Sequence, residues 1–363
     1  MKDALHRELL TIKDLSVDFT TKQGTVHALK NISLELTTRQ ILGIAGESGS
    51  GKSVSMLSIM NLLAPNASVV SGSIQFEGKE LSPLGLKNKK EKNEHEKMMK
   101  ELRGRDIAMI FQDPMTYLNP VLRIGVQMTE GIRKHTGCSK KEAMDKAADL
   151  LEQVGISNPQ KRLRQYPYEF SGGMRQRIII ATALACDPKL IIADEPTTAL
   201  DVTVQAQILD LIEKSVKEMG ASAIVITHDL GVVAKLCDNI AIMYGGEIVE
   251  YGTADDIFYD ARHPYTKGLL ASIPKKSDVK EPLPYIPGTP VNMLKSPKGC
   301  RFCSRCSAAM RICKEYHPQF TQWTEDHGAM CWLYCKDRAE QIVQEQDGQS
   351  RAAGSDTSLQ DHS

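Results

Sequence analysis

Eight residues, Gly46-Glu-Ser-Gly-Ser-Gly-Lys-Ser53, constrain the fold of this chain more than any other feature. They fit the pattern G-x-x-x-x-G-K-[ST] without a mismatch and follow a short apolar run, Ile41–Ala45, which is typical of a buried strand. Glycines there let backbone N–H groups converge on phosphate oxygens at the start of a helix, expected here at Val54–Leu63. Lys52 would reach the β and γ phosphates, and the Ser53 hydroxyl would hold Mg²⁺. The sequence therefore predicts an α/β nucleotide-binding domain.

Composition excludes several other classes of protein. With 363 residues, 41% of them hydrophobic, the chain can form one large domain and an appendage. Its 45 basic and 45 acidic residues give zero net charge, which disfavours nucleic acid as a partner. There is no apolar run long enough to span a bilayer, and the polar start lacks the apolar core of a secretory signal. We therefore expect a cytoplasmic protein.

The second half of the phosphate site is expected at Asp194 and Glu195, which end the apolar run Leu190–Ala193. This run and Ala223–Ile226 are continuous apolar segments, as in central strands of a parallel sheet covered on both faces. A carboxylate at such a strand end, beside the phosphate loop, can coordinate Mg²⁺ directly or through water. Two adjacent acids before Pro196 could instead cap a helix, but the preceding apolar run favours the metal role for Asp194.

Other segments show the organisation of the chain. Alternating residues at Leu9–Phe19 and His27–Leu36 predict antiparallel strands. Helical spacing predicts helices over Lys140–Val154 and Val204–Met219. The charged stretch Lys87–Lys100 has few apolar residues and indicates a solvated helical excursion or a flexible loop.

A third motif, Ser171-Gly-Gly-Met-Arg-Gln176, lies between the phosphate loop and the acidic pair. In this order the motifs resemble those of ATP-binding cassette (ABC) ATPases, in which each subunit closes over the ATP of the other. The resemblance covers residues 9 to about 260. It implies a P-loop NTPase cassette with an N-terminal antiparallel β-subdomain and a helical signature subdomain at about 113–176.

The resemblance also implies roles for single residues. Glu195 would act as general base on the attacking water, and His228 would be the switch histidine at the γ-phosphate. Gln112 would contact Mg²⁺ and the water, Phe19 would stack on adenine, and Asp201 would lie in the loop that communicates across the dimer. The catalytic residues expected are Glu195, His228 and Gln112, and the Mg²⁺ ligands expected are Ser53, Gln112 and Asp194. The residues expected to bind nucleotide are Phe19, Gly46, Glu47, Ser48, Gly49, Ser50, Gly51, Lys52, Ser53, Ser171, Gly172, Gly173, Gln176 and Asp201.

The signature implies a dimer. Its glycines precede a helix expected to begin near Met174, and in the resembling family this helix end binds the γ-phosphate of the nucleotide on the partner's phosphate loop. One chain alone would then be half of two active sites, closed by ATP and released by hydrolysis.

Two further stretches, Gln112–Pro120 and His263–Leu270, resemble the dipeptide and oligopeptide importer ATPases, a subgroup that also serves nickel. This resemblance implies an ATPase at the cytoplasmic face of the membrane, as a peripheral subunit. Its implied partners are a second ABC ATPase subunit, identical or homologous, two permease subunits and an external solute-binding protein. Nickel or another solute remains the alternative cargo.

Six of the nine cysteines fall between Cys300 and Cys335. Gly299-Cys-Arg-Phe302 resembles the C-terminal module of this subgroup, which carries a 4Fe-4S cluster. Ligation can supply folding energy that a small core cannot. Zinc is the alternative, because four cysteines also suit tetrahedral zinc, and Cys303 is a possible alternative ligand because it creates C-x2-C-x2-C. The ligands expected are Cys300, Cys306, Cys313 and Cys331.

These observations predict three parts. Residues 1–260 would form the ABC nucleotide-binding domain, 261–335 a C-terminal extension with the cysteine cluster, and 336–363 a polar, disordered tail. A soluble, non-transport ABC ATPase acting on nucleic acid is a rival, but the single phosphate loop and the neutral charge count against it. A redox-regulated ATPase with a cysteine sensor is a second rival.

Overall fold

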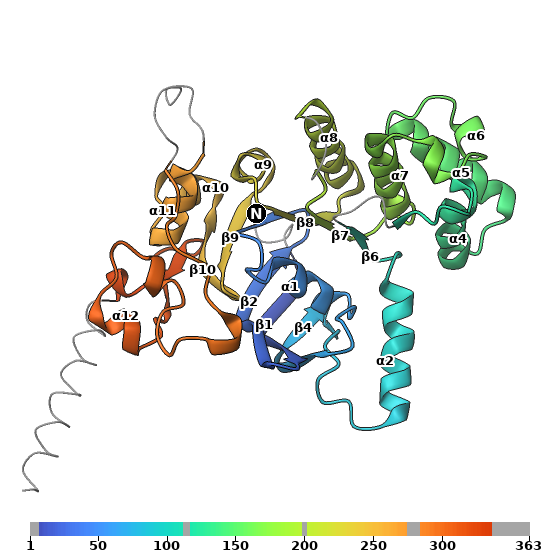
Figure 1. The fold of residues 1–363 in the computed structure, drawn as a ribbon. Coiled ribbons are helices and arrows are strands. Elements are labelled where there is room, and N and C mark those ends of the chain that lie inside the picture. Colours follow the sequence, from blue (N-terminus) through green and yellow to red (C-terminus); the bar gives the residue numbers. More distant parts are fainter. Residues whose placement is uncertain (1–6, 112–116, 198–201, 274–283, 336–363) are drawn as a thin grey trace, which may run out of the picture.

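The computed structural model describes residues 7–111, 117–197, 202–273 and 284–335. Among these residues, eight strands form a central sheet in the order β11-β12-β10-β9-β3-β8-β7-β6 (Figure 1). The strands from β9 to β6 run parallel, whereas β10, β12 and β11 are added antiparallel. Their bounds are β3 Ile41–Ala45, β6 Ile107–Ile110, β7 Leu190–Asp194, β8 Ser222–Thr227, β9 Asn239–Tyr244, β10 Glu247–Thr253, β11 Phe320–Gln322 and β12 Gly328–Met330.

A second, antiparallel sheet has the order β2-β1-β4-β5. The predicted hairpin is confirmed, since β1 pairs with β2 from Glu8 opposite Thr37 to Thr21 opposite Gly24. The bounds are β1 Glu8–Thr21, β2 Gly24–Thr37, β4 Ala67–Phe76 and β5 Lys79–Glu80.

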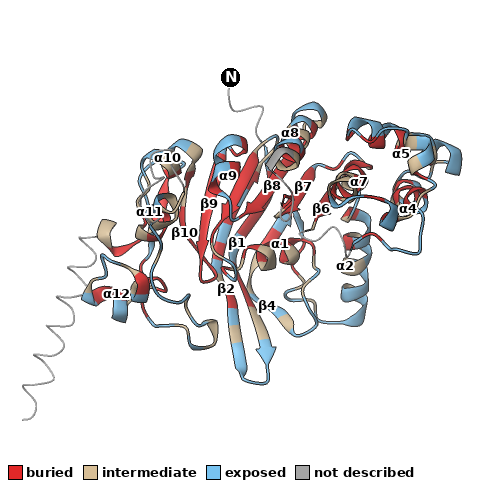
Figure 2. Cartoon of the chain, turned by 45° about the horizontal axis from the view of Figure 1, so that its top comes forward, coloured by how far each residue is buried: buried red, intermediate tan, exposed pale blue. Residues whose placement is uncertain are grey.

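The central sheet is buried on both faces, as Figure 2 shows in red. Successive side chains of a strand point to opposite faces. In β8, Ile224 and Ile226 therefore join the cluster shared with the antiparallel sheet and α1 (Lys52–Ile59), whereas Ala223 and Val225 join the cluster on the other face. This double burial explains why the central strands read as continuous apolar runs.

Helices cover the second face and continue into a helical subdomain. The cover includes α8 (Val202–Met219) and α9 (Leu230–Leu236). The helical subdomain lies between β6 and β7 in sequence and beyond β6 in Figure 1. Its helices are α4 Ile124–Thr136, α5 Lys140–Gln153, α6 Pro159–Arg162, the 3-10 turn η1 Pro167–Glu169 and α7 Gly172–Leu184.

Local capping explains two helix starts. Helix α5 begins where predicted because Ser139 and Glu142 form a capping box. The charged stretch is helix α2 (Lys89–Leu102), capped by Asn88, with Met99 and Leu102 buried. Of the two predicted structures for that stretch, the helical one is confirmed.

The C-terminal extension lies at the opposite end of the molecule from the helical subdomain (Figure 1). It includes α10 Ala254–Tyr259, α11 Pro264–Ala271, η2 Met293–Lys295, η3 Cys303–Arg305, α12 Arg311–Glu315 and η4 Trp332–Tyr334. Strand β12 pairs with β10, with Tyr251 opposite Gly328, so the central sheet continues across the predicted boundary at residue 260. The predicted tail at 336–363 is outside the described residues. No helix among the described residues is both long and apolar enough to cross a bilayer.

Candidate functional site

Three predicted site segments meet at the carboxyl edge of the central sheet. The phosphate loop follows β3, the acidic pair ends β7 and His228 follows β8. The register places Ala45 beside Thr227, and Asp194 beside Ile226. Because these strands are parallel neighbours, their carboxyl ends lie together, as expected for a ligand site of an open α/β sheet.

The phosphate loop requires two of its glycines. Gly46 has φ +153°, and a Cβ there would lie 2.2 Å from the Met243 carbonyl oxygen. Gly51 has φ +103°, and a Cβ there would lie 2.7 Å from Leu29 Cδ2. Helix α1 starts directly after Gly51, two residues before the predicted start, because this left-handed residue is its N-cap.

Lys52 is folded onto its own loop. Its Nζ donates to the carbonyl oxygens of Gly46, at 2.8 Å, and Glu47, at 3.0 Å. Burial lowers the pKa of Lys52, and the carboxylates of Glu195 and Asp194 oppose this shift. The amine is therefore buried in the loop, held by two carbonyl oxygens that phosphate oxygens could replace as its acceptors.

Asp194 and Ser53 fit the expected Mg²⁺ site. The Ser53 side chain hydrogen-bonds to the Asp194 carboxylate, and Asp194 Oδ1 is buried without a partner among the described residues. Burial raises the pKa of Asp194. An unpartnered buried carboxylate oxygen beside a hydroxyl is a donor set suited to Mg²⁺.

Replacing Asp194 with asparagine should stabilise the nucleotide-free chain and abolish Mg²⁺-dependent ATP hydrolysis. A raised folded-state pKa means that ionised Asp194 opposes folding at neutral pH, and that this penalty fades as pH falls through that pKa. We expect a gain of roughly 0.5–2 kcal/mol, measured by thermal unfolding at neutral pH. The gain should shrink in acid.

Asp210→Asn is the matched control, because Asp210 is exposed and pairs with Lys235 at 2.9 Å. It should give no gain. A less stable Asp194→Asn variant at neutral pH would contradict the prediction.

Glu195 and His228 lie within reach of each other. His228 Nδ1 is 3.4 Å from Glu195 Oε2, and the His228 side chain is 63% exposed. Glu195 has φ +46°, and its N–H donates to the Ile226 carbonyl oxygen at 2.9 Å. A left-handed backbone is costly for a glutamate, and such residues gather at functional sites. The main-chain bond to β8 holds this conformation in place.

The signature motif begins helix α7. Ser171 is its N-cap, with Oγ accepting from the Met174 N–H at 3.4 Å, so the helix starts two residues before the prediction. Ser171 and Gly172 are exposed, and a Cβ on Gly172 would meet no atom within 4 Å. The N-terminus of α7 is therefore open to a partner.

Gln176 lies on the inner side of the signature helix, and its predicted contact with nucleotide stays a prediction. It is buried, and its Nε2 donates to the Pro196 carbonyl oxygen at 2.9 Å. Gln176 therefore connects the signature helix to the segment that follows Glu195.

The remaining predicted residues are less informative. Phe19 is half-buried near the end of β1 and packs on the cluster between the sheets. Gln112 and Asp201 lie outside the described residues. Their predicted roles, and adenine stacking by Phe19, stay predictions.

The His263–Leu270 stretch has a physical role in the site. His263 caps α11, and burial lowers its pKa to about 3, so the imidazole is neutral and accepts from the Tyr265 N–H at 3.1 Å. Tyr265 in turn accepts from the backbone N–H of Glu47, at 2.8 Å. Sequence reasoning missed Tyr265 and also Arg305, which binds the Glu47 carboxylate. No local pattern signals either contact, because the partners are more than 200 residues apart.

The prediction of a 4Fe-4S cluster in the C-terminal extension is wrong. No group of three or more Cys, His, Asp or Glu side chains among the described residues, which include all six cysteines concerned, is placed to hold a metal ion. The same finding removes support for zinc. The expected ligands Cys300, Cys306, Cys313 and Cys331 and the alternative Cys303 are free thiols, and Cys300, Cys303, Cys306 and Cys313 lie in or against hydrophobic clusters.

The physical reason is burial. It raises the pKa of Cys300 to about 12 and of Cys331 to about 11, which adds to the cost of forming the thiolates that metal ligation needs. Cys313 is instead a core residue that packs with Ile312 and Trp332. Cys300, Cys303 and Cys306 likewise pack against hydrophobic clusters.

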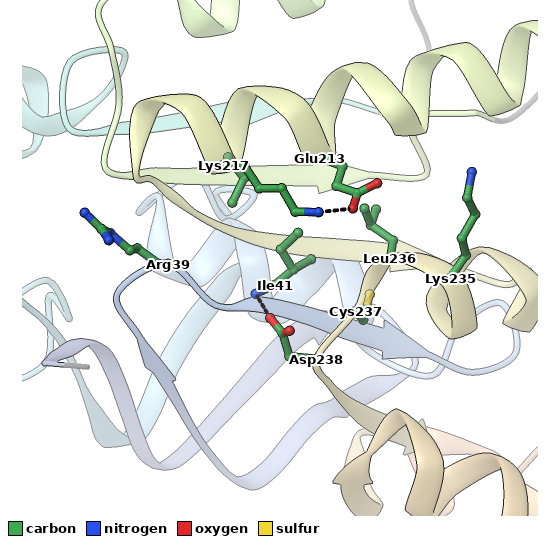
Figure 3. A pocket seen from close by; sticks show the side chains of 9 residues that line it. Arg39, Ile41, Glu213, Lys217, Lys235, Leu236, Cys237 and Asp238 are labelled. Atoms are coloured by element: carbon green, nitrogen blue, oxygen red, sulfur yellow. Dashed lines mark hydrogen bonds and ion pairs between the residues drawn. The ribbon is translucent and has the colours of Figure 1, made fainter. Parts of the chain in front are cut away.

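A pocket of about 360 Å³ lies away from the phosphate site, at the amino ends of β3 and β9. Figure 3 shows Arg39, Glu213, Lys217 and Asp238 among its lining residues. Lys217 pairs with Glu213 at 2.5 Å, and Asp238 accepts from the Ile41 N–H at 2.7 Å. The pocket lies at the opposite edge of the sheet from the phosphate loop and the acidic pair, so it is not part of the nucleotide site.

Comparison with known proteins gives two matches to families and several relatives. Residues 29–198 match the family described as ABC transporter, and residues 249–313 match the oligopeptide/dipeptide transporter C-terminal region. The oligopeptide transport ATP-binding protein OppD of Bacillus subtilis is 51% identical over 90% of this chain and 88% of its own length. The dipeptide transport ATP-binding protein DppD of the same organism is 48% identical over 93% of this chain and 97% of its own length.

Among solved structures, the chain resembles the dimeric, post-hydrolysis ATP-binding cassette MJ0796 bound to ADP and Pi. The TM-score is 0.59 at 25% identity, and the match covers 68% of this chain and 99% of that one. About two thirds of this chain therefore has the fold of that cassette.

Proposed function

This chain belongs to the ATP-hydrolysing subunits of ABC transporters that carry an oligopeptide/dipeptide transporter C-terminal region, and we propose that it energises uptake of di- and oligopeptides through separate permease subunits. The observation that carries the catalytic part is the meeting of the phosphate loop, Asp194 and Glu195 at one sheet edge. The peptide cargo is supported by relatives whose names give oligopeptide and dipeptide transport.

In the proposed reaction, water attacks the γ-phosphorus, and the bond from that phosphorus to the β,γ-bridging oxygen breaks, giving ADP and phosphate. Lys52 would exchange the Gly46 and Glu47 carbonyls for β and γ phosphate oxygens. Ser53 and Asp194 would hold Mg²⁺, which when bound neutralises charge on the phosphates.

Glu195 would take the proton of the attacking water as general base. His228, 3.4 Å from its carboxylate, would orient that group and contact the γ-phosphate. The main-chain bond from Glu195 to Ile226 fixes the backbone of the base relative to β8.

We further propose that the active unit contains two cassettes, this chain and an identical or homologous one. The exposed N-terminus of α7, with Ser171, Gly172 and Gly173, is suited to a γ-phosphate presented by the partner. When a phosphate binds at the N-terminus of α7, the bond from Gln176 to the Pro196 carbonyl oxygen would couple that binding to the segment next to the base. A dimeric state of the related cassette supports this arrangement.

The membrane path would come from two permease subunits, with an external solute-binding protein delivering the peptide. An apolar patch at residues 117–126 supports docking of such a partner. Within it, Val121 is 75% exposed and Val126 49%, and Tyr117 stacks on Phe111 with ring centroids 4.0 Å apart. The chain would then work at the cytoplasmic face as a peripheral subunit.

Uptake of labelled dipeptide, longer peptide and nickel should be measured in cells that lack the chromosomal copy. We expect this chain to restore peptide uptake and the Glu195→Gln variant to restore none, because the cargo moves only when ATP is hydrolysed. Restoration of nickel uptake alone would assign the other cargo. Equal restoration by the variant would refute the coupling of hydrolysis to uptake.

A further inference from the structure

The second residue of the phosphate loop, Glu47, is held by the C-terminal extension. Arg305 donates from Nη1 to Glu47 Oε2 at 2.6 Å and from Nη2 to Glu47 Oε1 at 2.9 Å. Tyr265 accepts from the Glu47 N–H at 2.8 Å. Side chain and main chain of one loop residue are thus both bound by a segment more than 200 residues away.

The position of Arg305 is set by the extension rather than by Glu47. Its Nε donates to the Pro287 carbonyl oxygen at 3.0 Å, and Nη2 also donates to the Ile286 carbonyl oxygen at 3.2 Å. The guanidinium lies over the Tyr244 ring, 5.7 Å from the centroid, and the side chain is almost fully buried. Because these contacts fix the planar guanidinium of Arg305, its positive charge has a defined position relative to the phosphate loop.

A second arginine of the extension supports the same loop indirectly. Arg301 donates to the Gly245 carbonyl oxygen in the turn between β9 and β10, and its Nε is 3.1 Å from Glu247 Oε1. In that turn the Gly246 N–H donates to the Ser50 carbonyl oxygen at 2.8 Å. The extension therefore binds the loop directly at Glu47 and supports it at Ser50 through this turn.

Glu47 presents an electrostatic difficulty that Arg305 resolves. A carboxylate in a loop that binds a triphosphate repels the ligand, and the repulsion acts at short range in a partly buried site. The bidentate ion pair with Arg305 neutralises the charge of the Glu47 carboxylate and holds this carboxylate against the extension. The hydrogen bond to Glu47 raises the pKa of Arg305, so the guanidinium stays charged at any working pH.

We propose that Arg305 is a positioning residue of the phosphate site, which by neutralising and holding Glu47 lets the C-terminal extension set the affinity of the loop for nucleotide. The inference rests on the proposed function, since it assumes that this loop binds ATP. It assigns the extension a role in the ATPase itself.

The test is nucleotide binding to the purified full chain by Arg305→Gln, Glu47→Gln and the double variant. Arg305→Gln should weaken ATP binding about tenfold, with a smaller loss for ADP, because the repulsion from Glu47 grows with phosphate charge. Glu47→Gln alone should bind ATP more tightly than wild type, because it removes the repelling carboxylate and leaves the Arg305 charge near the loop. The double variant should return close to the wild-type affinity, and Arg305→Lys, which keeps the charge, should lose less than Arg305→Gln.

Arg311→Ala is the matched control, because Arg311 belongs to the same extension but is 90% exposed and pairs with Glu315 within α12. It should leave both affinities unchanged. If the double variant binds ATP as weakly as Arg305→Gln, and the affinities for ATP and ADP fall alike, Arg305 only stabilises the local structure and the inference fails. Unchanged affinity in Arg305→Gln overturns it too, whereas a wild-type chain that binds no ATP refutes the proposed function instead.

Discussion

Replacing Glu195 with glutamine will lower steady-state ATP hydrolysis by roughly 100-fold or more, while ATP binding stays near the wild-type level. The amide keeps the size of the side chain but cannot accept the proton of the attacking water. Lys52, Ser53 and Asp194, which are expected to hold the nucleotide and Mg²⁺, are untouched. Phosphate release and nucleotide affinity should be measured separately on the purified chain.

The geometry makes this effect large. The main chain of Glu195 is bonded to Ile226, and its carboxylate lies 3.4 Å from His228, at the position expected of the general base. The neighbouring Asp194 is buried, with one oxygen bonded by Ser53. General-base catalysis depends on position to within a few tenths of an ångström, so the neighbour is a poor substitute.

Glu218→Gln is the matched control, since Glu218 is an exposed glutamate of α8 that pairs with Lys214 at 3.7 Å. It should hydrolyse ATP at the wild-type rate. A hydrolysis rate of Glu195→Gln within a few-fold of wild type would refute the assignment of Glu195 as the base. Loss of ATP binding in this variant would mean that Glu195 contributes to binding the nucleotide.

Much of the fold and the catalytic edge could be predicted from the sequence because the signals are local. The phosphate loop follows its strand directly, Asp194 ends a continuous apolar run, and Ser139 with Glu142 marks the start of α5. Each of these depends on residues within a few positions of one another. Parallel strands then bring their carboxyl ends together without further information.

The contacts of the C-terminal extension could not be predicted in this way. The pairing of β12 with β10 and the ion pair of Arg305 with Glu47 join residues far apart in the sequence. No periodicity of the sequence encodes either contact. The cysteine spacing was misleading for a related reason. Spacing alone does not distinguish ligation from packing: Cys300 packs against hydrophobic clusters and Cys331 is buried.

The second large effect is expected in mixtures of two inactive variants. Lys52→Ala removes the phosphate-binding amine, and Gly172→Asp puts a carboxylate at the exposed N-terminus of α7, where a partner's γ-phosphate is expected. Each variant alone should hydrolyse ATP at least 100-fold more slowly than wild type, because each homodimer then lacks one half of both sites. Gly172→Asp should fold normally, since a Cβ there meets no atom within 4 Å and an acid suits a helix N-terminus.

Mixed in equal amounts, the two variants should recover activity. In a mixed dimer, the intact loop of the Gly172→Asp chain faces the intact signature of the Lys52→Ala chain, so one composite site is whole. Random pairing puts about half of the chains in such dimers, and the rate should reach roughly a quarter of wild type if one site suffices. Gly131→Asp, on α4 with similarly open space, is the control and should hydrolyse ATP normally by itself.

The mixture distinguishes a shared site from a site within one chain. If each chain held a complete site, mixing would give the sum of two inactive preparations, and the signature would act only on its own phosphate loop. If the recovery appears only when a homologous cassette supplies the second chain, the pair is a heterodimer and the composite site still holds. Recovery in the mixture of these two variants requires that the α7 N-terminus of one chain and Lys52 of the other act on the same ATP, which is the arrangement that the exposed signature favours.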